Sequence, residues 1–83
     1  AAEEAQEIFA VAEPLLPAHV AHVCHHRTGM PTDEILHFID EMGIRLVVIG
    51  GRKHSRVTGL LLGSVTQAVL EYAHSNVLVA GRA

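Results

Sequence analysis

The stretch that decides the fold is residues 46–80, which read LVVIGGRKHSRVTGLLLGSVTQAVLEYAHSNVLVA. A short apolar run stands near each end, residues 46–49 and residues 77–80, and strands are predicted there over residues 45–49 and 76–80. The first run is continuous rather than alternating, which predicts a strand covered on both faces, as in a parallel sheet. Gly50 ends this strand, and Gly63 precedes a helix that leads to the second strand.

Upstream of this stretch, the same alternation of helix and strand continues. A third strand is predicted near Ala18 to His25. Pro31 and the acidic residues after it begin a helix that Gly43 ends. Glu3 lies in the first turn of an expected N-terminal helix, whose continuation Pro14 limits. Alternating units of this kind predict an α/β fold with parallel strands in a single domain.

Positive charge is concentrated in the loop after the first strand of the stretch. Arg52, Lys53 and Arg56 are three of only six Lys and Arg residues in a chain of net charge −3. Such a loop faces the ligand in open α/β sheets, and the N-H groups at the Gly63-Ser64 helix start favour phosphate. The alternative to a phosphate site is that Gly50 only turns the chain, Gly63 only permits close helix packing, and the basic residues form a solvated loop.

The pattern Gly50-x2-Lys53-x9-Gly63-Ser64, with the run LLLGSV around its end, resembles the universal stress protein family. Domains of that family end in a strand, a Gly-x2-Gly-x9-Gly-Ser/Thr phosphate-binding loop, a helix and a last strand. Lys53 stands where the family has its second glycine. The segment GMPTDEIL, from residue 29, is similar to the one that opens the preceding helix in this family.

The resemblance implies a three-layer, parallel-sheet α/β architecture that is flavodoxin- or Rossmann-like, of the adenine nucleotide alpha hydrolase-like type. The family domain has five parallel strands in the order 3-2-1-4-5, and this sequence has room only for the last three. Residues 1–83 are therefore interpreted as the C-terminal portion of such a domain, with only its C-terminal strands and helices. Truncation, fission of the gene, or incomplete representation of a longer chain would each explain this.

The resemblance also implies a regulatory domain of the stress response with a residual phosphate site for ATP or AMP. The residues expected at that site are Gly50, Arg52, Lys53, Gly63, Ser64 and Val65. The alternative is an interaction module of the same fold that binds no nucleotide, such as one cut from a larger protein. The family's last strand commonly makes the dimer contact, which implies a homodimer through Asn76, Val77, Leu78, Val79 and Ala80. Lys53 and the missing strands favour the alternative, whereas Gly63-Ser64 and the basic loop favour nucleotide.

A metal site is the next hypothesis, because the chain has seven histidines. His19, His22, Cys24, His25 and His26 are clustered, and alternation along a strand would place His22, Cys24 and His26 on one face. A strand inside a sheet would bury these groups, and no second ligand pair has finger-like spacing. We therefore expect packed or strand-end histidines and no metal.

Other classes of function are not supported by the sequence. It has no Walker lysine loop, nucleophile elbow or supported catalytic triad, so we expect no enzyme. Its apolar runs are far shorter than the roughly 20 residues that cross a bilayer. We expect no membrane contact and no nucleic acid partner. We expect a cytoplasmic location. Cys24 is the only cysteine, so no internal disulfide can form.

Overall fold

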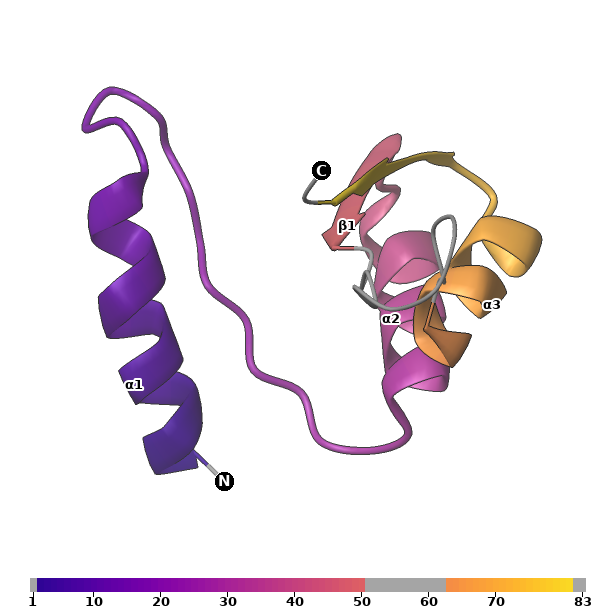
Figure 1. Cartoon of the computed structure of the whole chain (residues 1–83), viewed down its shortest axis with the longest axis horizontal. Coiled ribbons are helices and arrows are strands. Elements are labelled where there is room, and N and C mark those ends of the chain that lie inside the picture. Colours follow the sequence, from indigo (N-terminus) through magenta and orange to yellow (C-terminus); the bar gives the residue numbers. More distant parts are fainter. Residues whose placement is uncertain (1, 51–62, 82–83) are drawn as a thin grey trace, which may run out of the picture.

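The computed structural model describes residues 2–50 and 63–81 of the chain. Figure 1 shows the order of its elements along the chain. Their bounds are α1 (Ala2–Ala12), a 3-10 turn η1 (Glu13–Leu15), α2 (Pro31–Met42), β1 (Leu46–Gly50), α3 (Ser64–Tyr72) and β2 (Asn76–Ala80).

The two strands of the described residues pair in parallel, as the sequence predicted. The register runs from Leu46 opposite Asn76 to Gly50 opposite Ala80. β2 has the predicted bounds, and β1 lies one residue further along the chain than predicted. Parallel strands need a crossover connection, and α3 forms the described part of it.

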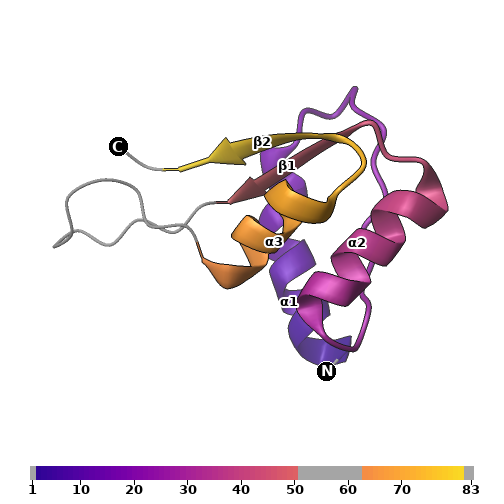
Figure 2. The same ribbon diagram turned by 90° about the vertical axis from the view of Figure 1, so that its right-hand side faces the viewer.

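Both α2 and α3 lie on the same side of the strands (Figure 2). The core is the packing between these two helices and the strands, where Val69 is fully buried and Ile39 is 5% exposed. On the opposite face of the sheet, Leu46 and Val48 are 58% and 60% exposed. The prediction that β1 is covered on both faces is therefore wrong. Val47 and Ile49 point to the helices and are half-buried, so burial alternates although the sequence does not.

The predicted strand from Ala18 to His25 is also wrong. Residues 18–20 form a turn, residues 21–25 have no ladder partner among the described residues, and every residue from 18 to 25 is exposed. A strand is defined by hydrogen bonds to a neighbour, so an apolar extended sequence without one stays a connecting segment. Figure 1 shows it running between α1 and α2, apart from the two strands.

The helix ends follow the local signals in the sequence. α2 begins at Pro31, whose missing N-H would have no helical partner in any case. It ends at Gly43, which has φ 61° and ψ 41°, the left-handed conformation that glycine adopts readily. α1 ends at Ala12, and Pro14 lies in the short turn η1 that follows.

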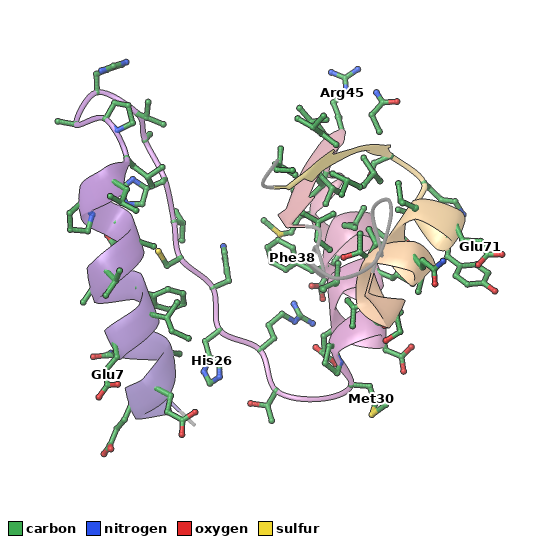
Figure 3. All side chains as sticks on the ribbon, viewed as in Figure 1. Glu7, His26, Met30, Phe38, Arg45 and Glu71 are labelled. Carbon is green, nitrogen blue, oxygen red and sulfur yellow. The ribbon has the colours of Figure 1, made fainter. Side chains whose placement is uncertain are left out.

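Arg27 attaches the extended segment, the residues between η1 and α2, to α2 itself. Its Nε donates to Glu34 Oε1 at 3.0 Å and its Nη1 donates to Glu41 Oε2 at 2.8 Å. Its guanidinium carbon also lies 5.6 Å from the centre of the Phe38 ring, a cation-π distance. Figure 3 labels the preceding residue, His26, whose side chain lies on the same segment and away from the strands.

Candidate functional site

The N-terminus of α3 is the first candidate site. Gly63 precedes it with φ −66° and ψ 161°, and no side chain of the described residues caps it. The first backbone bond of the helix is that from Gln67 N to Gly63 O at 3.0 Å. The N-H groups of Ser64, Val65 and Thr66 come before it, and no acceptor for them is found among the described residues.

The charge around this helix start differs from that of the other two described α-helices. The first turn of α3 contains no acidic residue, whereas α1 carries Glu3 and Glu4 there and α2 carries Asp33 and Glu34. Carboxylates in the first turn repel a second anion while they stabilise the helix. Of the three, α3 therefore has the N-terminus best suited to phosphate.

A part-buried hydrogen bond fixes this helix start beside the sheet. The Thr66 hydroxyl donates to the Gly50 carbonyl at 3.2 Å, and Thr66 is 5% exposed. The contact brings the first turn of α3 to the carboxyl end of β1, where open α/β sheets bind their ligands. Sequence reasoning missed Thr66. The signal was a hydroxyl on the apolar side of the helix, near Val65 and Val69, because a buried hydroxyl needs a hydrogen-bond partner.

The structure describes four of the six residues predicted to bind phosphate. Gly50, Gly63 and Ser64 are exposed and Val65 is half-buried. Arg52 and Lys53 lie outside the described residues. The described part of the predicted site is therefore the backbone and hydroxyl side of it, and the basic side remains a prediction from the sequence.

The last strand is the second predicted site. β2 pairs with β1 along one edge, and the structure describes no strand along its other edge. Leu78 is 56% exposed and lies opposite Val48, which is 60% exposed. Val77 and Val79 point to the helices and are half-buried. Two paired strands thus present an apolar strip on the face that α2 and α3 do not cover.

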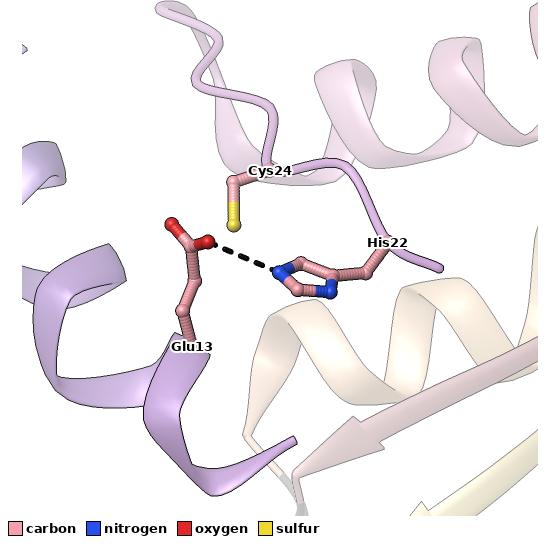
Figure 4. A group of neighbouring side chains, drawn as sticks. All are labelled: Glu13, His22 and Cys24. Atoms are coloured by element: carbon pink, nitrogen blue, oxygen red, sulfur yellow. Dashed lines mark hydrogen bonds and ion pairs between the residues drawn. The ribbon is translucent and has the colours of Figure 1, made fainter. Parts of the chain in front are cut away.

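A third site brings together Glu13, His22 and Cys24 (Figure 4). Their ligand atoms all lie within 4.8 Å of one another. His22 Nε2 is 3.0 Å from Glu13 Oε2, and its Nδ1 is 3.3 Å from the Val20 carbonyl oxygen. The sequence grouped His22 and Cys24 with a second histidine on a strand, but the third member is a carboxylate from η1.

The electrostatics of this cluster follow from its hydrogen bonds. The bond to His22 lowers the pKa of Glu13, and the same bond raises the pKa of His22. Desolvation raises the pKa of the Cys24 thiol, and the nearby Glu13 carboxylate raises it further. The hydrogen bond thus favours the charged forms of Glu13 and His22, and the surroundings of Cys24 disfavour its thiolate.

An apolar cleft of about 530 Å³ lies between the extended segment, α2 and β1. The residues that line it include His25, Arg27, Ile35, Phe38, Ile39 and Val47. The His25 and Phe38 rings lie 4.8 Å apart, centre to centre. Sequence reasoning missed this cleft, because it assigned His25 to the end of a strand.

None of the described helices has the length and apolar character needed to cross a membrane.

Comparison with known proteins agrees with the fold. The model of the universal stress protein family matches residues 1–81. The chain is also similar to universal stress protein MJ0577 of Methanocaldococcus jannaschii, with 32% identity over 54 residues. That match covers 65% of this chain and 33% of the relative, so the chain spans about a third of the length of the curated relative. No solved structure matches the chain significantly. The family is a Rossmann-like α/β family, and the chain belongs to it: it is a member of the universal stress protein family.

Proposed function

We propose that the chain is a non-catalytic regulatory domain of the stress response that binds the phosphate groups of an adenine nucleotide, ATP or AMP. One observation carries the proposal: the N-terminus of α3 has no acidic residue or side-chain cap among the described residues, and Thr66 holds it at the carboxyl end of β1. Helix N-termini in this position bind phosphate through their N-H groups and dipole.

Each described residue would have a distinct part in binding. A Cβ added to Gly63 would meet no described atom within 4 Å, so no described residue covers the backbone on that side. The N-H groups of Ser64 and Val65 would donate to phosphate oxygens, and the exposed Ser64 hydroxyl would add a donor. Arg52 and Lys53, predicted from the sequence, would supply counter-charge. This arrangement recognises an anion and needs no acid or base.

Amide NMR titration with ATP and with AMP tests the proposal. We expect localised shifts at Gly50, Ser64, Val65 and Thr66, and no comparable shifts at the N-terminus of α2. Gly63→Val should weaken the response at least several-fold, because φ −66° suits valine while its side chain blocks close approach. Met30→Val, at the same capping position of α2, is the matched control. Millimolar nucleotide without a localised shift would rule out the site.

A second candidate function is self-association, and the exposed pair Val48 and Leu78 favours it. We propose that a second copy of the chain pairs with the outer edge of β2, over residues 76–80. An unpaired edge beside apolar side chains is a template for a further strand. A two-fold axis through that edge would close the assembly as a dimer and would also extend the apolar strip across both copies.

Sedimentation equilibrium at high micromolar concentration tests this contact. The unmodified chain should have the mass of a dimer. Leu78→Pro should shift it to monomer by removing a ladder N-H, while Leu78→Thr should keep the ladder and weaken the dimer only in part. Circular dichroism checks that each variant is folded. A folded monomer of the unmodified chain at that concentration would contradict the proposal.

A further inference from the structure

Three potential metal ligands of different chemistry converge at the end of η1. They are the carboxylate of Glu13, the imidazole of His22 and the thiol of Cys24, and they come from two segments of the chain (Figure 4). All three residues are exposed, so an ion can reach them from solvent. This cluster lies outside the proposed phosphate site and the β2 edge, and the inference drawn from it is independent of both.

The orientation of the His22 ring prepares one of its nitrogens for a cation. Nδ1 lies 3.3 Å from the Val20 carbonyl oxygen, which can only accept, so Nδ1 carries a hydrogen. In the neutral ring, Nε2 then has a lone pair, and it faces a carboxylate oxygen of Glu13 at 3.0 Å. Two acceptors at this distance need a positive centre between them, which is either a proton or a metal ion. Metal-binding histidines commonly donate their other N-H to a carbonyl in this way.

We propose that Glu13, His22 and Cys24 form a zinc site, with Oε2, Nε2 and Sγ as ligands and water in the fourth position. On binding, zinc displaces the proton of the thiol, and the proton between Nε2 and Oε2 where one is present, and both are released to solvent. Tetrahedral zinc would separate these ligand atoms by about 3.3–3.8 Å. The observed separations are 3.0 Å between Glu13 and His22 and at most 4.8 Å between any two, so small side-chain movements suffice. Nitrogen and thiolate ligands select zinc over magnesium or calcium, which prefer all-oxygen sites.

This proposal replaces the expectation of no metal, because one of the two reasons for that expectation, burial of the histidines, fails. The histidines were expected to be buried in a strand inside a sheet. Instead, the segment from Ala18 to His25 lies outside the sheet and is exposed, and η1 supplies a carboxylate. Zinc would therefore tie η1 to residues nine and eleven positions further along the chain, and would stabilise that chain reversal.

Protection of the thiol from alkylation tests the site, because Cys24 is the only cysteine in the chain. Zinc should slow the reaction of Cys24 with iodoacetamide at least tenfold, and magnesium at the same concentration should not. Glu13→Gln and His22→Gln should each reduce the apparent zinc affinity roughly tenfold or more. His26→Gln is the matched control, since it removes an exposed histidine of the same segment from outside the cluster.

Cobalt supplies a second, spectroscopic measurement on the unmodified chain. One bound Co²⁺ should give a thiolate-to-metal charge-transfer band and the visible bands of tetrahedral coordination, and zinc should displace it. Absence of the charge-transfer band would overturn the proposal. Equal loss of zinc affinity in His22→Gln and His26→Gln would also overturn it, because it would show binding to surface histidines in general.

Discussion

The Thr66 hydroxyl donates a 3.2 Å hydrogen bond to the Gly50 carbonyl, and this contact joins the first turn of α3 to the last residue of β1. Thr66→Val keeps the side-chain shape and removes the donor. We expect a loss of about 0.5–1.5 kcal/mol in the free energy of unfolding, measured by urea denaturation. Thr66→Ser, which keeps the hydroxyl, is the control. A valine variant as stable as the unmodified chain would show that the contact contributes nothing.

Among the described residues, Val69 of α3 is fully buried, where this helix packs against α2 and the strands. Val69→Ala removes two methyl groups and leaves a cavity, so we expect unfolding to be easier by about 1.5–3 kcal/mol. The neighbouring Leu70 is 42% exposed, and Leu70→Ala should cost clearly less although it removes more atoms. Thermal denaturation of both variants would compare them. Equal losses would contradict this description of the core.

Gly43 ends α2 in a left-handed conformation, with φ 61°. Gly43→Ala places a Cβ on that backbone and should destabilise the fold by about 1–2 kcal/mol. The cause is the backbone conformation rather than crowding, since an added Cβ would meet no described atom within 4 Å. Gly43→Asn should lose less, because asparagine tolerates this conformation. Denaturant midpoints for the two variants should differ in that order.

The ion pair between Arg27 and Glu41 should make the free energy of unfolding depend on pH. The hydrogen bond from Arg27 lowers the pKa of Glu41 below its usual value of 4.5. A carboxyl with a lowered folded-state pKa binds fewer protons when folded than when unfolded. Its contribution is therefore present above pH 4.5 and is lost as the pH falls through the folded-state value.

Glu41→Gln should accordingly be less stable than the unmodified chain at pH 7, and the difference should fade on acidification. Glu71→Gln, at an exposed position of α3, is the matched control. Urea titrations from pH 7 down to strongly acidic pH would measure both. A difference that stays constant with pH would mean that the charge on Glu41 is not the cause.

The sequence by itself determined the elements whose ends depend on single residues. Pro31 and Gly43 bound α2, because proline lacks an N-H and glycine accepts a positive φ. The start of α3 after Gly63 was predicted in the same way, and so were the bounds of β2. These signals are local, since they depend on the chemistry of one residue or on the spacing within one element.

Only the tertiary structure decided which surfaces are covered and which distant residues meet. Val48 is exposed because both neighbouring helices lie on the other face of the sheet, and the apolar run in the sequence says nothing of where helices pack. The segment from Ala18 to His25 is not a strand because a strand needs a neighbour to pair with. Glu13 meets His22 because the chain turns back between them, with Val20 N bonded to Pro17 O at 3.0 Å. Pairing, coverage and convergence depend on the positions of other parts of the chain, which no local pattern specifies.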